Sequence, residues 1–403
     1  MTRPRWKRIA LWTLAILLML LLAAGLWFRQ SPYYAALTLF ADGHRAEHFR
    51  NMDRIFPTRL VPRGEDVWTL PVAPRTLTTT YTFRGEERDL GAFLDRTETT
   101  GLLVLHRGRI VHEVYRLGAD ETSLFTSWSV AKSVLGVLIG IALDEGAIAD
   151  VRDPIGLYVP ALAGSGYANV PIEDVLTMSS GVHFDEDYEN PRSDINMLFV
   201  RAMVHGTPLE ESIAALESVR PPGTFNEYIS SDSMALGLVL EAATGMRLAD
   251  YLSSRLWAPM GAETDATWNT DRTGREFALC CLNATLRDYA RFGQLVLQGG
   301  ARDERSIVPT SWLEASVNPV APHLQPGENP ASSWTFGYGY KWWLPEEPQG
   351  DFTAIGVWGQ YVYVNPAREV VIVKTSTDPA FDDNDHETIA AFRAIVEGLA
   401  IEE

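Results

Sequence analysis

The sequence predicts an α+β fold, an α/β sandwich in which an antiparallel sheet comes from both ends of the chain and is flanked by helices. Two observations lead to this prediction. Apolar, β-branched segments occur at residues 101–118 and again from Phe336 onward, as expected of strands. Between them, residues 150–320 show repeated helical periodicity that ends at glycine. We therefore expect a mostly helical subdomain inserted at about 150–320.

The N-terminus carries a basic cluster followed by a long apolar run. The cluster is Arg3, Arg5, Lys7 and Arg8, and residues 9–28 contain no charged side chain. A run of roughly 20 such residues spans a bilayer as a helix, and basic residues stay on the cytoplasmic side. We expect residues 1–30 to be an uncleaved anchor in the inner membrane, with the bulk of the chain periplasmic or extracellular. A cleaved signal peptide is the alternative.

Composition excludes some partners and leaves others open. The chain of 403 residues is 46% hydrophobic and 21% charged, which is typical of a folded globular protein. Its formal net charge of -18 argues against a nucleic-acid partner, which requires a basic face. The cysteines, Cys280 and Cys281, are adjacent, and neighbouring cysteines rarely bridge without strain. We therefore expect no disulfide framework.

The elements follow in order from their patterns. Residues 31–75 look like a connector with some helix and an extended Pro/Gly-rich end. The segment "GLLVLHRGRIVHEVYRLG" predicts a hairpin around an Arg-Gly turn, and an apolar helix should run from Ser129 to Gly146. Later strands are expected within "FGYGYKWWL", "FTAIGVWGQYVYVNP" and "REVVIVKTST", before a final helix in "DHETIAAFRAIVEGLA". The acidic run "DPAFDDNDHE" suggests a solvated loop.

The strongest chemical signal is Ser129-Val130-Ala131-Lys132 at the start of the apolar helix. Residues at i and i+3 share a helix face, so the lysine amine is within reach of the serine oxygen. A serine hydroxyl needs a base to become a nucleophile, and a desolvated lysine has a lowered pKa that suits this task. The spacing alone also occurs by chance at solvated helix starts. Here the following residues are apolar, so a buried lysine requires an explanation.

Four stretches resemble, in order, the serine β-lactamase and penicillin-binding-protein superfamily. They are "SVAKSVLGVLIGIALDEGAIADVRDPIGLYVPAL", "PIEDVLTMSSGV", "PPGTFNEYISSDSMALGLVLEAATG" and "NATLRDYARFGQLVLQGG". The resemblance covers about residues 76–400 and is greatest to the class C branch with its esterase and amide-hydrolase relatives. "DEDYENP", "LAGSGY" and "AIGVWGQYVYVNP" resemble the 6-aminohexanoate-dimer hydrolases. The resemblance to the superfamily implies a β-lactamase-like fold for residues 76–403.

The resemblance also implies a site around the serine nucleophile. Tyr228 occupies the place of the proton-shuttling tyrosine in the Y-x-N motif, and Ser230 stands where the family has asparagine. A plain core tyrosine is the alternative for Tyr228. "Ser231-Asp232-Ser233" mimics another family motif, but we interpret it as the start of the next helix.

Gly356 and Gly359 match the paired glycines of the family's K-T-G-like strand. Val357 and Ser129 would then supply backbone N–H groups to an oxyanion hole. The position of the family's lysine or histidine is Ala354, which removes a cation that would hold a substrate carboxylate. "Lys374-Thr375-Ser376" also resembles K-T-G, but its context suggests the neighbouring strand.

Two further side chains complete the expected substrate site. The resemblance places Tyr188 at the substrate amide, whereas a surface-loop tyrosine is the alternative. Trp358 is expected to line the substrate pocket, and Trp342 or Trp343 are weaker candidates for the same role. The predicted function is a serine hydrolase that forms an acyl-enzyme on a small amide or ester, without cofactor or metal. The alternatives are a β-lactamase or D,D-peptidase, and a catalytically silent, membrane-tethered binding protein.

Overall fold

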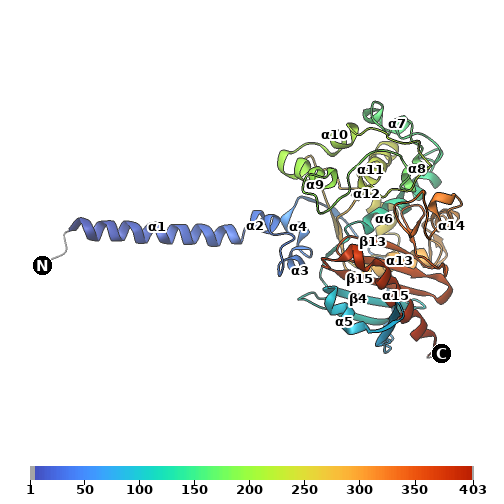
Figure 1. The fold of residues 1–403 in the computed structure, drawn as a ribbon, viewed down its shortest axis with the longest axis horizontal. Helices are drawn as coiled ribbons and strands as arrows, with labels where there is room; N and C mark the ends of the chain where they lie inside the picture. Colours follow the sequence, from blue (N-terminus) through green and yellow to red (C-terminus); the bar gives the residue numbers. More distant parts are fainter. Residues whose placement is uncertain (1–4, 402–403) are drawn as a thin grey trace.

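A computed structural model describes residues 5–401, so Arg3 of the basic cluster lies outside the described residues. Helix α1 (Arg5–Arg29) extends away from the body of the protein (Figure 1) and its apolar side chains are exposed. Its length and composition suffice to cross a membrane, and an N-terminal signal sequence passes the same test. The apolar run predicted from the sequence is therefore a single helix with exposed apolar side chains, and its C-terminal end contacts α2 through Phe28 and Tyr34.

The body is organised around a seven-stranded antiparallel sheet with strand order β11-β12-β13-β14-β15-β4-β5. Its strands are β4 (Thr99–His106), β5 (Arg109–Tyr115), β11 (Gly337–Tyr338), β12 (Trp343–Leu344), β13 (Phe352–Gly356), β14 (Gln360–Asn365) and β15 (Val370–Ser376). Strand β15 pairs with β4 along its whole length, which joins the C-terminal strands to the early hairpin. The predicted α+β fold, with a sheet built from both ends of the chain, is confirmed.

Helices cover both faces of this sheet. The side chains along β15 show this, because they belong alternately to two core clusters on opposite faces. Val371 and Val373 belong to the core cluster that contains α13 (Leu286–Leu297), whereas Val370 and Ile372 belong to the cluster that contains α15 (Phe381–Ile401). Successive side chains of a strand point to opposite faces, so a strand buried on both faces is apolar throughout. Helix α5 (Leu90–Arg96) and the hairpin of β2 (Thr80–Phe83) and β3 (Glu86–Asp89) lie on the α15 side.

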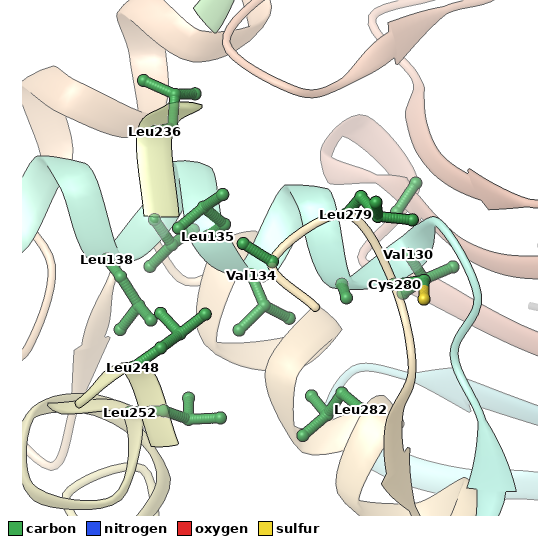
Figure 2. Close-up of a cluster of buried hydrophobic side chains, with 14 of the residues drawn as sticks. Val130, Val134, Leu135, Leu138, Leu236, Leu248, Leu252, Leu279, Cys280 and Leu282 are labelled. Atoms are coloured by element: carbon green, nitrogen blue, oxygen red, sulfur yellow. The ribbon is translucent and has the colours of Figure 1, made fainter. Parts of the chain in front are cut away.

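Helix α6 (Val130–Asp144) is the buried helix predicted to follow Ser129. Figure 2 shows its apolar side chains meeting others from α11 (Ser230–Thr244), from α12 (Leu248–Leu252) and from the chain around β8 (Leu282–Ala284). Full burial of a Val or Leu side chain contributes about 1.5–3 kcal/mol, so this packing holds the helix rigidly in place. The labelled side chains are Val130, Val134, Leu135, Leu138, Leu236, Leu248, Leu252, Leu279, Cys280 and Leu282.

The inserted region is largely helical, as predicted, but it also contains short strands. Its remaining helices are α7 (Ile155–Tyr158), α8 (Ile172–Leu176), α9 (Asp194–Val200), α10 (Leu209–Ala214) and α14 (Thr310–Val317), with the π-helices η2 (Arg201–His205) and η3 (Ser253–Trp257). Strand β7 (Ala266–Asn269) and β8 form a four-stranded sheet with β1 (Thr58–Val61) and β6 (Phe125–Thr126), in the order β1-β7-β8-β6. Strands β9 (Ala301–Arg302) and β10 (Arg305–Ser306) form a separate hairpin. Strands of two to four residues leave too little periodicity to detect in a sequence.

The segment between α1 and the sheet packs against the body. Helices α2 (Pro32–Leu37), α3 (Arg45–His48) and α4 (Met52–Ile55) precede β1, which pairs with β7. Leu39, Phe49 and Met52 are buried in the main core. This segment therefore contributes to the folded body as well as connecting it to α1.

The expectation of no disulfide is wrong. Cys280 and Cys281 are joined in a disulfide between adjacent residues, in the loop between β7 and β8. The backbone at Cys281 has φ +70°, in the left-handed region, which turns the chain tightly at this point. Both residues are buried. A sequence argument from typical chain geometry does not anticipate this turn.

Candidate active site

Ser129 lies at the N-terminus of α6, directly after a turn in the backbone. Trp128 has φ +41°, in the left-handed region, and the helix begins with Ser129 as its N-cap. The turn is anchored by Ser127, whose N–H donates to the Leu282 carbonyl at 2.7 Å and whose hydroxyl accepts from the Leu282 N–H at 3.0 Å. The Ser129 side chain therefore meets the positive end of a rigid helix, which favours developing negative charge.

Lys132 is brought to the serine as the i, i+3 spacing predicts. Its Nζ donates a hydrogen bond to Ser129 Oγ at 2.6 Å, and the side chain is 1% exposed. Burial lowers the pKa of Lys132 to about 8, while the nearby charge of Glu186 acts in the opposite direction. The neutral amine, in contact with the hydroxyl, is therefore far more populated near neutral pH than it is in an exposed lysine.

Tyr228 completes this cluster. The Lys132 ammonium nitrogen lies 4.7 Å from the centroid of the Tyr228 ring, and the ring stacks on Trp343 at 5.2 Å. Burial and the charge of Glu186 raise the pKa of Tyr228, and its hydrogen bond with Ser129 lowers it. The net direction is upward, so the phenol keeps its proton when Lys132 is neutral.

Glu186 is the residue of this cluster that sequence reasoning missed. Its carboxylate accepts hydrogen bonds from the Ser230 N–H at 2.7 Å, the Ser230 hydroxyl at 2.5 Å and the Tyr188 hydroxyl at 2.6 Å. The signal was present in "DEDYENP", from which Tyr188 alone was selected. The Ser230 hydroxyl, at the position where the family has asparagine, therefore donates to Glu186.

The turn between β13 and β14 packs against the start of α6. A Cβ added to Gly356 would lie 2.5 Å from the Ser127 carbonyl oxygen and 3.0 Å from the Ser129 nitrogen, so a side chain there would separate the two segments. In the part of the chain that the structure describes, the Ser129 and Val357 N–H groups have no turn, cap or side-chain acceptor. Ser129 and Val357 both line the cavity described below, so these N–H groups are available as donors to a ligand there.

Gly359 closes the same turn for a conformational reason. It has φ +80°, and a Cβ there would lie 2.3 Å from Ser376 Oγ. Lys374 lies behind this turn on β15, where its Nζ donates to Ser376 Oγ at 3.0 Å. It thus belongs to the neighbouring strand, as predicted. Ala354 is fully buried in the core beneath β13.

A cavity of about 600 Å³ opens beside the nucleophile. Ser129, Tyr188, Tyr228, Trp343 and Val357 all line it. Tyr188 is therefore a half-buried wall residue, where a surface-loop position was the alternative. Trp342 lies away from the cavity, packed in the core against aromatic rings of α13 and β13.

The charged lining of this cavity is acidic. Its carboxylates come from the loop before α9, from the segment before α11 and from the first turns of α15, and no lysine or arginine is among its described lining residues. Asp382 and Asp385 belong to the acidic run that was expected to be a solvated loop. That expectation is wrong, because these residues begin α15, and burial raises the pKa of Asp382 to about 6 and that of Asp385 to about 7.

Trp358 lines a second cavity that meets the first at Ser129. Its ring stacks on Phe40 of the N-terminal segment, with centroids 5.5 Å apart and planes 9° apart.

The motif "Ser231-Asp232-Ser233" lies in the first turn of α11, as predicted, and is buried. Around Ser129 the structure places Lys132, Tyr188, Tyr228, Ser230 and Val357, with Trp358 on the side of the second cavity and Trp342 away from both cavities.

Comparison with known proteins identifies the family. A family model described as Beta-lactamase matches residues 87–395. The chain belongs to the β-lactamase family. Within this family it is 31% identical over 343 residues to the 6-aminohexanoate-dimer hydrolase of Paenarthrobacter ureafaciens, covering 83% of this chain and 86% of the relative.

Two solved structures have a similar fold. A structure described as "Putative 6-aminohexanoate-dimer hydrolase from Bacillus anthracis" superposes with a TM-score of 0.81 at 25% identity, covering 89% of this chain and 95% of that one. A family VIII carboxylesterase superposes with a TM-score of 0.57 at 16% identity, covering 75% and 95%. The latter likeness concerns the fold alone.

Proposed function

We propose that this β-lactamase-family protein is a serine hydrolase that cleaves a small amide or ester through an acyl-enzyme on Ser129. The observation that carries the proposal is the 2.6 Å contact between Lys132 Nζ and Ser129 Oγ, made by an amine whose pKa burial lowers to about 8. Such an amine is a base matched to a serine hydroxyl. The 6-aminohexanoate-dimer hydrolase relative supports a linear amide as one substrate class.

The proposed reaction has two halves. Neutral Lys132 takes the Ser129 proton as Oγ bonds to the substrate carbonyl carbon, and the N–H groups of Ser129 and Val357 stabilise the oxyanion. Tyr228, which holds its proton, donates it to the leaving oxygen or nitrogen as that bond breaks, and is reprotonated from Lys132. Water then attacks the acyl-enzyme carbonyl and loses a proton to neutral Lys132. That proton passes to Ser129 Oγ as its bond to the acyl carbon breaks, which releases the carboxylic acid and restores the Ser129 hydroxyl.

The cavity favours this function over a β-lactamase or D,D-peptidase. Those substrates carry a carboxylate, and the acidic lining repels it. The family's cation is replaced by Ala354, which is buried and cannot contact substrate. For a catalytically silent binding protein we find no favouring observation, because Ser129, Lys132 and Tyr228 are assembled in contact.

We further propose that α1 anchors the protein in the inner membrane, with the hydrolase body on the periplasmic or extracellular side. Its length, its apolar surface and the basic residues in its first turns support this placement. The acidic body then faces away from the cytoplasm.

The test is covalent labelling with a fluorophosphonate probe. We expect wild-type protein to be labelled and Ser129→Ala to be unlabelled. The matched control is Ser333→Ala, because Ser333 lines the same cavity and is exposed. It should be labelled like wild type. Persistent labelling of Ser129→Ala, or failure of the wild type to hydrolyse p-nitrophenyl acetate, would contradict the proposal.

A further inference from the structure

The second cavity, of about 530 Å³, differs in character from the first. Its walls are largely aliphatic and aromatic, and its polar side chains are Ser129, Tyr188, Glu189, Asn196 and Ser230. The apolar walls come from the N-terminal segment, from α9 and η2, and from the loop that carries the Cys280–Cys281 disulfide; they include Leu39, Phe40, Phe199, Met203, Phe277 and Leu279. An apolar cavity of this kind favours an apolar ligand.

We propose that this second cavity holds a long aliphatic acyl chain, so that the substrate is a lipid-like ester or amide. The inference rests on the proposed function, because it assigns one half of a substrate whose carbonyl is attacked by Ser129. Ser129 lies where both cavities meet. A chain in the second cavity and a leaving group in the first would place the scissile carbonyl at the Ser129 hydroxyl.

The residues at the mouth of the second cavity indicate where the acyl chain would enter. Leu37, Val200 and Val204 line the cavity, yet they are 77%, 37% and 65% exposed. Leu37 ends α2, which begins three residues after the last residue of α1. Figure 1 shows α1 leaving the body on the side that carries α2 and α9.

The exposed apolar surface continues beyond the mouth. Tyr33, on the same N-terminal segment but outside the cavity lining, is 73% exposed, and the wall residue Phe40 is itself 50% exposed. Exposed apolar side chains that cluster at a cavity mouth mark an interaction with an apolar phase. With α1 in a bilayer, the mouth lies at the membrane surface, where an acyl chain enters the cavity without crossing water.

The first cavity then selects the leaving group. Its lining carboxylates favour an amine or a neutral alcohol over a phosphate or carboxylate. The two cavities together describe a fatty-acyl ester or N-acyl amine. Hydrolysis of such a substrate releases a fatty acid from the second cavity and the amine or alcohol from the first.

The experiment compares p-nitrophenyl acetate, butyrate, octanoate and laurate, using the full chain in detergent micelles. We expect kcat/KM for laurate to exceed that for acetate by at least about tenfold, because each methylene in an apolar pocket adds binding free energy. Val204→Asp at the mouth should lower kcat/KM for laurate about tenfold and leave acetate within about twofold. The matched control is Val320→Asp, because Val320 is also an exposed valine, at 95%, and is not a cavity residue.

Each outcome bears on a different proposal. The acyl-chain assignment would be overturned if kcat/KM stayed constant or fell with chain length, or if Val204→Asp and Val320→Asp had equal effects on laurate hydrolysis. Continued hydrolysis of acetate in that case would leave the hydrolase proposal intact. A second mouth variant, Leu37→Asp, should reproduce the selective loss on laurate. If acetate is not hydrolysed and Ser129→Ala is still labelled, the hydrolase proposal itself fails and the acyl-chain assignment fails with it.

Discussion

The carboxylate of Glu186 binds both polar groups of Ser230, accepting from its backbone N–H at 2.7 Å and from its hydroxyl at 2.5 Å. Ser230 is the first residue of α11, so the carboxylate also lies at a helix N-terminus, where negative charge is stabilised. The charge of Glu186 raises the pKa of Lys132 against the effect of burial. One side chain thus links the loop that carries Tyr188, the start of α11 and the candidate base.

Replacing Glu186 should change the pH dependence of acylation. In Glu186→Gln the stabilising charge is lost, so the pKa of Lys132 falls further and the rising limb of the rate profile moves to lower pH. The measurement is the rate of the p-nitrophenol burst with p-nitrophenyl acetate as a function of pH. Glu189→Gln is the matched control, because Glu189 lines the same cavity and is not among the charges that shift the pKa of Lys132. A limb that stays in place or moves upward would refute this electrostatic role.

The wild-type enzyme should become faster as pH rises through about 8, the pKa to which burial lowers Lys132. The sign follows from the base role: the neutral amine accepts the Ser129 proton, and its fraction grows as pH passes the pKa. In Lys132→Arg the side chain stays protonated, so acylation should fall by about 10²–10⁴-fold and lose this limb. Far-ultraviolet circular dichroism checks that the variant is folded. Near-normal acylation by a folded Lys132→Arg would exclude Lys132 as the base.

The sequence pattern was sufficient to predict features that lie within a single helix or strand. The i, i+3 spacing of Ser129 and Lys132 and the apolar residues after them predicted both a buried helix and a lysine in contact with the serine. The long β-branched runs predicted β4, β14 and β15 for the same reason, because strands buried on both faces are apolar throughout. The edge strand β5 is only partly buried and was predicted from the Arg-Gly turn that joins it to β4.

Contacts between distant segments could not be predicted in this way. The role of Glu186 depends on Ser230, forty-four positions away, and the acidic start of α15 reaches the cavity only through the packing of the whole sheet. The Cys280–Cys281 disulfide depends on a tight turn that residue type does not reveal. The strands of the second sheet are too short to show a period.

Gly356 should be required for activity more than for folding. In Gly356→Ala the added Cβ would meet the Ser127 carbonyl oxygen at 2.5 Å, so the turn that carries Val357 must move away from Ser129. Losing one oxyanion donor lowers kcat by about 10²–10³-fold, and we expect a fall of that order with a smaller change in KM. Gly164→Ala is the control, because a Cβ there meets nothing within 4 Å. Equal kcat in the two variants would argue against an oxyanion role for this turn.

The stacked rings of Phe40 and Trp358 should hold the N-terminal segment on the body and so keep the second cavity closed. Their centroids are 5.5 Å apart, and such a pair contributes about 0.5–1.5 kcal/mol beyond its buried area. In Phe40→Ala this contact and one wall of the cavity are lost. We expect faster cleavage of the segment between α1 and β1 in limited proteolysis, and a larger loss of kcat/KM on laurate than on acetate.

The control for this prediction is Tyr33→Ala, because Tyr33 lies on the same segment, is 73% exposed and is not a lining residue of the cavity. It should leave both the proteolysis rate and the ratio of laurate to acetate hydrolysis unchanged. If Phe40→Ala behaved like Tyr33→Ala, the segment would be held by its other buried residues, Leu39, Phe49 and Met52, and Trp358 would wall the cavity without the help of Phe40. A change in proteolysis without a change in the hydrolysis ratio would separate the two roles, assigning the stack to attachment of the segment alone.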